Sequence, residues 1–300
     1  MTPNPVLKRL GLADTDRAVI IHADDIGMCQ STVTAFAELT DFGLISSGAV
    51  MVPCAWFPTI SAYCRDHPTL DVGVHLTLNC EWYAYGWPPI STADRASGLI
   101  DGRGYMWRTR RETLENADPT AVAVEAEAQI RRALDAGIDA THIDSHMFSI
   151  VSPRFMQSYV DLAQRYRLPA FAFRPSSVGF ARAAAGGDAD GDLTPFLQQM
   201  EEAGLPLFDH ADFLPLNAHE DRVEVAKERL GRLPAGLSYF ILHPAADTPE
   251  IRALAPDYRS RVADYQAFLS PALRDFVRDQ GIHVIGYRAL RDLWRGASAA

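Results

Sequence analysis

The sequence has little cysteine, no run of basic residues and no long apolar stretch, and each absence excludes a class of protein. Its 300 residues include 4 cysteines with no C-x-x-C pair, which argues against a zinc knot or a disulfide framework. Lys and Arg number 28 against 38 Asp and Glu, a formal net charge of −10, which disfavours nucleic acid and anionic membranes as partners. No stretch approaches the ~18 apolar residues of a membrane span, and residues 1–8 lack the apolar core of a signal peptide. We therefore expect a cytoplasmic protein with four reduced, mostly packed cysteines.

Short apolar runs alternate with helical patterns along almost the whole chain. Strands are predicted at residues 17–22, 47–52, 70–76, 140–146, 170–173, 207–208, 237–243 and 282–286, with helical patterns between them. Seven or eight such units predict an α/β fold with a parallel β/α barrel-like sheet, a distorted TIM-type barrel. A chain of this length can form one large domain, so we predict a single catalytic domain over residues 1–300.

Three segments fall outside the alternation: an N-terminal arm at 1–17, an insertion at 79–110 and a loop at 176–192 that we expect to be flexible. The insertion is rich in aromatic residues, among them Trp82, Tyr105 and Trp107. Exposed aromatic rings stack on sugar faces, and the same rings can also pack on one another beneath a lid. The sequence leaves both interpretations open.

Residues able to do chemistry follow several predicted strands. Asp24 and Asp25 end the first strand, His75 ends another, His142 and His146 flank a third, and His243 follows the apolar run at 237–242. The carboxyl ends of parallel strands converge on one face of a barrel. One Asp and two His around a divalent ion form a common catalytic metal site. Adjacent carboxylates on a loop cannot both point the same way, which favours one metal ligand and one base.

Each of these residues also has a purely structural interpretation. A lone histidine at a strand end is more often a hydrogen-bonded structural residue, and we place His22, His67, His210, His219 and His283 in that class. An Asp pair before a helix can serve as an N-cap. Histidines four apart on a strand-to-loop passage do not share a helical face. From spacing alone, a metal site and a structural role remain balanced.

Four motifs in order give the chain a resemblance to a known family. They are Ile21-His-Ala-Asp-Asp-Ile-Gly27, Gly73-Val-His-Leu-Thr77, Thr141-His-Ile-Asp-Ser-His146 and Leu242-His-Pro244, and Ser97–Tyr105 matches a loop before a long helix. Together they resemble the YdjC-like carbohydrate deacetylases across almost the whole chain. The resemblance implies a β/α barrel-like fold and removal of an acetyl group from N-acetylated sugars with the help of one divalent metal ion.

The resemblance also implies roles for particular residues. It assigns Asp25, His75 and His146 as metal ligands, Asp24 as general base, His243 as general acid, and Arg174 as the residue that orients the catalytic carboxylate. His142 and Asp144 are expected to support the ligands. An Asp-His-His set suits Zn²⁺, and Mg²⁺, Mn²⁺, Co²⁺ or Ni²⁺ with added waters.

The chain departs from the family pattern directly after His146. Met147 and Phe148 stand where family members often carry further histidines, so we expect a more apolar pocket in which Met147 contacts the substrate. The predicted partner is a small N-acetylated sugar or glycoconjugate, and the chain is expected to form a homodimer. The alternatives are another metal-assisted hydrolase, such as a phosphoesterase, and a carbohydrate-binding barrel without turnover.

Overall fold

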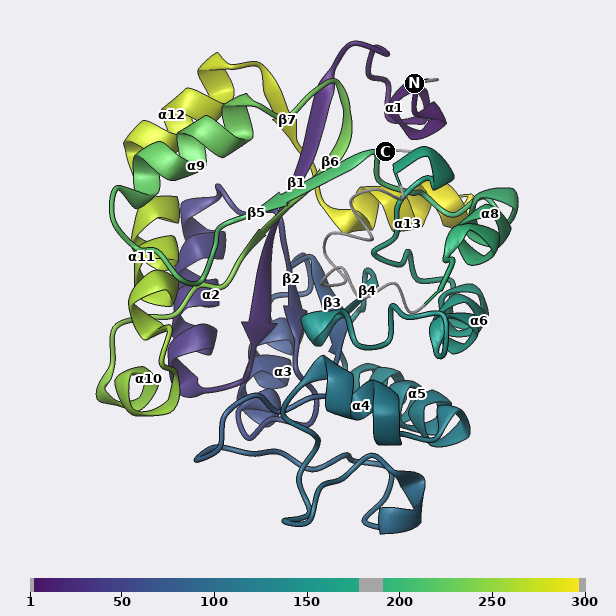
Figure 1. The fold of residues 1–300 in the computed structure, drawn as a ribbon. Helices are drawn as coiled ribbons and strands as arrows, with labels where there is room; N and C mark the ends of the chain where they lie inside the picture. Colours follow the sequence, from purple (N-terminus) through teal and green to yellow (C-terminus); the bar gives the residue numbers. More distant parts are fainter. Residues whose placement is uncertain (1–2, 178–190, 297–300) are drawn as a thin grey trace.

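The computed structural model describes residues 3–177 and 191–296, which are built around one parallel sheet (Figure 1). Its strands are β1 (Arg17–Ile26), β2 (Ser47–Val50), β3 (Val72–Leu76), β4 (Ile143–Ser145), β5 (His210–Phe213), β6 (Gly236–Leu242) and β7 (Ile282–Val284). Their order is β4-β3-β2-β1-β6-β5, and β7 pairs with β1. Every pairing is parallel.

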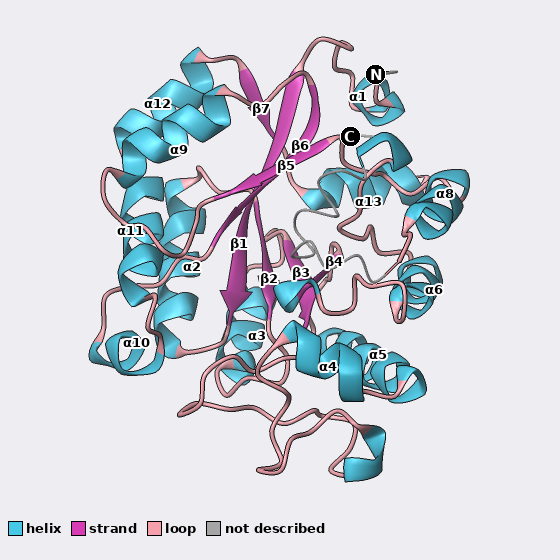
Figure 2. Cartoon of the chain, viewed as in Figure 1, coloured by secondary structure: helices cyan, strands magenta, loops and turns pink. Residues whose placement is uncertain are grey.

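Helices surround this sheet (Figure 2). They are α1 (Pro5–Arg9), α2 (Gln30–Phe42), α3 (Phe57–Asp66), α4 (Arg110–Asn116), α5 (Pro119–Asp135), α6 (Met156–Tyr166), α8 (Thr194–Glu202), α9 (Arg222–Gly231), α10 (Pro249–Leu254), α11 (Tyr258–Phe268), α12 (Pro271–Asp279) and α13 (Tyr287–Arg295). Three short 3-10 helices are η1 (Arg95–Ser97), η2 (His146–Phe148) and η3 (Pro175–Ser177). Within the described ranges, no helix is both long and apolar enough to cross a membrane.

The sheet curls into a distorted barrel, which confirms the predicted fold class. Single bridges join Ile143 to Ala170 and Phe173 to Phe208, so residues 170–173 continue the curl from β4 toward β5. Among the described residues, the runs predicted as strands at 170–173 and 207–208 form only these single bridges. The regular strand begins later, at His210.

The inner face of the barrel carries polar side chains at every second position of several strands. On β1 these are His22 and Asp24, and on β3 it is His75, with Gly73 two residues earlier on the same face, because side chains alternate between the two faces of a strand. Most other positions of β1 and β3 are apolar and belong to the hydrophobic core, as expected for parallel strands covered by helices. The alternation of side chains along each strand therefore places polar groups inside the barrel at successive levels along its axis.

The predicted arm and loops have distinct fates. Within the arm, α1 docks on the barrel, where the buried Asn4 amide donates to the Leu207 carbonyl at 2.9 Å and to Asp209 at 2.8 Å. The 79–110 segment is mostly loop and lies beyond the ends of the strands (Figure 2). The loop predicted at 176–192 lies largely outside the described residues. All four cysteines are buried and free, as expected.

Candidate active site

The aspartate pair ends β1 in an unusual backbone conformation. Asp25 has φ 63°, in the left-handed region that non-glycine residues seldom adopt. The β1–β2 register also shifts between Ala23 and Ile26. This break in the strand turns both Asp24 and Asp25 into one pocket. Within the shared pocket the two carboxylates face different partners: Asp25 lies against His146 and Arg261, and Asp24 lies against His22 and His243.

A cavity of about 540 Å³ opens above these two residues. Its size is typical of pockets for small ligands. Its polar floor consists of Asp24, Asp25, His75, Glu81, Ser145, His146, His243, Asp257 and Arg261. Its apolar wall consists of Met147, Phe148, Phe213, Leu214, Leu216 and Ile241. The pocket is thus lined by charged and polar side chains together with apolar ones.

Asp25, His75 and His146 have the geometry of a metal-binding set. One ligand atom from each lies within 4.8 Å of the other two, and all three residues are buried. Asp25 Oδ1 is 3.4 Å from His75 Nε2 and 3.0 Å from His146 Nδ1. Donors around a tetrahedral ion with bonds of ~2.0–2.1 Å lie roughly 3.3 Å apart. The three side chains therefore fit a divalent ion.

Each of the three residues is fixed by a charged partner on its other side. Asp144 Oδ1 lies 2.8 Å from His75 Nδ1, and Glu81 Oε2 lies 2.9 Å from His146 Nε2. Arg261 Nη1 donates to Asp25 Oδ2 at 2.7 Å. Carboxylates that hold the second nitrogen of a metal-binding histidine set its tautomer and orientation.

The charges of this cluster favour a cation. Burial opposes ionisation of Asp25, but His146 and Arg261 outweigh it and hold the pKa of Asp25 well below its usual range. Burial lowers the pKa of His75 and of His146, but the surrounding carboxylates outweigh it and raise both. The raised pKa means that both imidazoles favour the protonated, positively charged form when no metal ion is bound. Metal binding to such ligands displaces their protons.

Asp24 and His243 face each other across the same floor. Asp24 Oδ2 is 3.8 Å from His243 Nε2 and 3.9 Å from His75 Nε2. The His243 backbone amide donates to Asp264 at 3.0 Å, and Asp264 pairs with Arg222. Asp24, near the end of β1, and His243, directly after β6, thus present a carboxylate and an imidazole to one pocket.

The structure places Arg174 away from this site. Its guanidinium pairs with Asp209 at 3.0 Å, and of the described residues it is not one that lines the pocket. Asp209 accepts from the Leu237 amide, and Leu237 pairs with Ala18. Asp24 is six residues further along β1, roughly 20 Å at ~3.3 Å per residue. The prediction that Arg174 lies beside Asp24 is therefore wrong. His22 occupies that place, with Nδ1 2.7 Å from Asp24 Oδ1.

Of the four residues expected to contact the substrate, Met147 lines the pocket and three do not. Trp82 is 8% exposed and lies over the Arg261 guanidinium, 5.4 Å from its centre. The Trp107 indole donates to the Gly98 carbonyl within its own loop, and Tyr105 is exposed beside Arg103. In this structure the aromatic segment packs largely on itself and braces Arg261.

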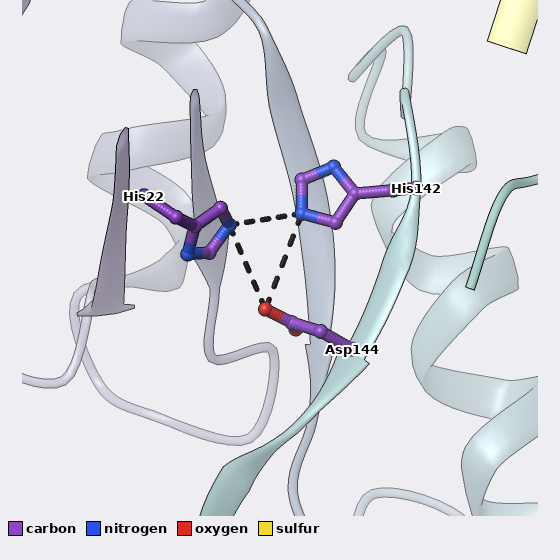
Figure 3. Close-up of side chains that lie close together, drawn as sticks. All are labelled: His22, His142 and Asp144. Atoms are coloured by element: carbon purple, nitrogen blue, oxygen red, sulfur yellow. Dashed lines mark hydrogen bonds and ion pairs between the residues drawn. The ribbon is translucent and has the colours of Figure 1, made fainter. Parts of the chain in front are cut away.

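The two residues expected to support the ligands differ in their contacts. Asp144 holds His75 directly, as described above. His142 instead contacts His22, with 2.9 Å between their Nε2 atoms. His22, His142 and Asp144 form a second buried cluster (Figure 3). His142 therefore acts one step further from the ligands than expected.

The sequence reasoning missed Glu81, Arg261 and His22. Glu81 lies in the insertion and Arg261 on α11. Neither belongs to a motif or follows a predicted strand, so the sequence does not indicate that they approach the strand-end residues. His22 had a usable signal, because it lies two residues before Asp24 on one strand and must share its face. The signal for His22 is the alternation of side chains along β1, which places it on the face of Asp24, and not its position relative to the end of the strand.

The fold and site define a class of protein: a parallel β/α barrel with an Asp-His-His set and a separate carboxylate and imidazole at the carboxyl ends of its strands. The model of the family described as YdjC-like protein matches residues 18–279. The chain belongs to this family, as the four motifs predicted.

Relatives agree with this assignment, and a solved structure shares the fold. A carbohydrate deacetylase of Thermus thermophilus is 31% identical over 293 residues, covering 96% of this chain and 98% of the relative. A carbohydrate deacetylase of Thermoanaerobacter pseudethanolicus is 24% identical, covering 91% and 99%. A crystal structure from Enterococcus faecalis V583, described as a candidate for cellobiose-phosphate cleavage, is similar in fold with a TM-score of 0.72 and 21% identity, covering 92% of this chain and 99% of that one.

Proposed function

We propose that this protein is a metal-dependent deacetylase that removes the acetyl group from an N-acetylated sugar. One observation carries the proposal: the Asp25–His75–His146 set shares a pocket with Asp24 and His243. Hydrolysis of an acetamide needs an electrophile for the carbonyl, a base for water and an acid for the leaving nitrogen. The relatives named carbohydrate deacetylase support the choice of a sugar substrate.

The residues divide this work between them. A divalent ion held by Asp25, His75 and His146 would polarise the acetamide carbonyl and lower the pKa of water. Asp24 Oδ2 faces His75 and His243 in the pocket and accepts the proton of the attacking water. His243 Nε2, 3.8 Å from that oxygen, donates a proton to the departing amine nitrogen, which cannot leave as an anion. General acid–base groups of this kind each contribute about 10²–10⁴-fold.

The apolar wall suits the parts of the substrate that carry no charge. Met147 follows His146 directly, at φ 50°, and Phe148 has φ 54°. Two successive left-handed residues cost conformational energy and are found where function requires them. They direct hydrocarbon surface beside the metal ligands, where the acetyl methyl group and the apolar face of a sugar ring would lie.

The test is acetate release from N-acetylglucosamine and its short β-linked oligomers. Chelated protein is reloaded separately with Zn²⁺, Mg²⁺, Mn²⁺, Co²⁺ or Ni²⁺, with bound metal measured in each sample. We expect metal-dependent release that is lost in His75→Ala. An inert enzyme with one equivalent of bound metal would contradict the proposal and direct the search to phosphate esters.

A further inference from the structure

We propose that His22 is a positioning residue for Asp24, and that His142 fixes His22 from the opposite side. The inference rests on the proposed function, in which Asp24 is the base. Its evidence is separate, because neither histidine lines the pocket among the described residues. Both side chains are fully buried in the barrel interior.

The first step is the contact between His22 and Asp24. They are two residues apart on β1 and face the same side, so His22 Nδ1 lies 2.7 Å from Asp24 Oδ1. An ionised carboxylate only accepts hydrogen bonds, so His22 Nδ1–H is the donor. That bond holds Oδ1 and leaves Oδ2 turned toward His75 and His243. His22 thereby determines which oxygen of the base is free.

The second step is the support behind His22. Its Nε2 lies 2.9 Å from His142 Nε2 (Figure 3). His142 Nδ1 is 2.9 Å from the Thr141 hydroxyl, which donates to Asp71 at 2.7 Å. The His142 ring stacks on Tyr287, with ring centres 3.8 Å apart. Burial and the neighbouring His22 lower the pKa of His142, so its ring is neutral, and the hydrogen bond between the two Nε2 atoms ties His22 to it.

The third step is the space that the chain leaves for His142. Gly73 faces inward on β3 directly beside this ring. A Cβ at Gly73 would lie 2.5 Å from His142 Nε2, far inside van der Waals contact. Position 73 therefore needs glycine, because the His142 ring, which contacts His22, occupies the space that a side chain would take.

A second metal site is the competing interpretation, because His22, His142 and Asp144 also bring three ligand atoms within 4.8 Å. The hydrogen bonds favour positioning. The two Nε2 atoms are at direct hydrogen-bonding distance, and Asp144 Oδ2 accepts from the Tyr239 hydroxyl at 3.2 Å. These groups satisfy one another without an ion. Metal stoichiometry distinguishes the two interpretations.

The experiment compares His22→Asn, His22→Gln and His22→Leu in the metal-loaded protein. The Asn amide nitrogen lies near the position of Nδ1 and keeps a donor for Asp24, whereas Gln reaches toward His142 and Leu does neither. We expect His22→Asn to retain most of kcat, and Gln and Leu to lower kcat by about 10–100-fold, the usual cost of losing such a partner. KM and the single equivalent of bound metal should not change. The exposed His283→Gln is the matched control.

Equal losses in all three His22 variants would indicate a merely structural residue, and unchanged kcat in all three would also overturn the proposal. Loss of a second metal equivalent would show a metal site instead. A wild-type protein that releases no acetate contradicts the deacetylase proposal alone. In that case nitrogen-15 NMR of labelled histidine still tests the contact: the His22 Nδ1–H signal should shift in Asp24→Ala, and an unchanged signal would disprove it.

Discussion

Two clusters of one aspartate and two histidines lie in this barrel, and they differ in what their nitrogens face. In Asp25–His75–His146, carboxylates hold the outer nitrogens and the inner ones converge beside an open cavity. In His22–His142–Asp144, the histidine nitrogens face each other at 2.9 Å (Figure 3). The same residue types therefore form a set that could hold a metal ion in the first, outer cluster and a network of mutual hydrogen bonds in the second, inner cluster.

The comparison teaches that residue type does not define a metal site. A site needs lone pairs that point at a common empty volume, together with partners that hold the ligands in that orientation. The outer cluster has both. The inner cluster's polar groups pair with one another and with neighbouring buried side chains, which is what buried polar groups require.

The largest expected effect separates the two histidines of one motif. His146→Ala should abolish binding of the metal ion and lower kcat/KM by at least about 10³-fold, because a metal supplies several kcal/mol of charge stabilisation. His142→Ala should retain one equivalent. Elemental analysis of both dialysed variants measures this directly. Equal metal loss in the two variants would remove the distinction between the clusters.

A somewhat smaller effect is expected at Asp24, whose carboxylate lies between His22 of the inner cluster and His75 of the outer one. Asp24→Asn should lower kcat by about 10²–10⁴-fold, the usual contribution of a general base, with metal still bound. Steady-state kinetics and metal content on the same preparation are the measurement. A rate near that of the wild type would show that Asp24 is not the base.

A substitution that crowds the inner cluster should lower the free energy of unfolding. Gly73→Ala places a methyl group against the His142 ring, and overpacking of this kind costs about 1–3 kcal/mol of the free energy of unfolding. Gly102→Ala is the matched control, because nothing lies within 4 Å of its added Cβ. Urea denaturation of both variants compares them. If Gly73→Ala is as stable as the control, the barrel interior can relax around His142.

The smallest effect on turnover is expected at Arg174. Its partner Asp209 lies near the amino ends of β5 and β6, so Arg174→Met should lower the thermal midpoint while kcat stays unchanged. Thermal unfolding and kcat of the folded variant, measured together, check this. A selective fall in kcat at unchanged stability would return Arg174 to the reaction.

Much of the fold was predictable because its signals are local. Apolar runs and the helical patterns between them are set by neighbouring residues, and strands β1, β2, β3, β4, β6 and β7 all lie within or overlap predicted runs. The strand predicted at 207–208 was displaced to His210–Phe213, since two apolar residues do not define a register. The motifs likewise predicted the family, which the comparisons confirm.

The site was predictable only in part. The residues at strand ends are brought together because parallel strands end on one face, and Asp24, Asp25, His75, His146 and His243 do share a pocket. Their roles remain proposals. Glu81 and Arg261 carried no signal, because a loop and a distant helix meet the ligands only through tertiary packing.

The sequence by itself determined the alternation, the strand ends and the family, since these follow from short-range pattern and from motifs read in order. Only the tertiary structure decided that Asp25 turns back into the pocket beside Asp24, that His22 rather than Arg174 holds that carboxylate, and that the Trp82 ring braces Arg261. The physical reason is that such contacts depend on where separate elements meet in space. Spacing along the chain does not encode that meeting, except where two residues share one strand.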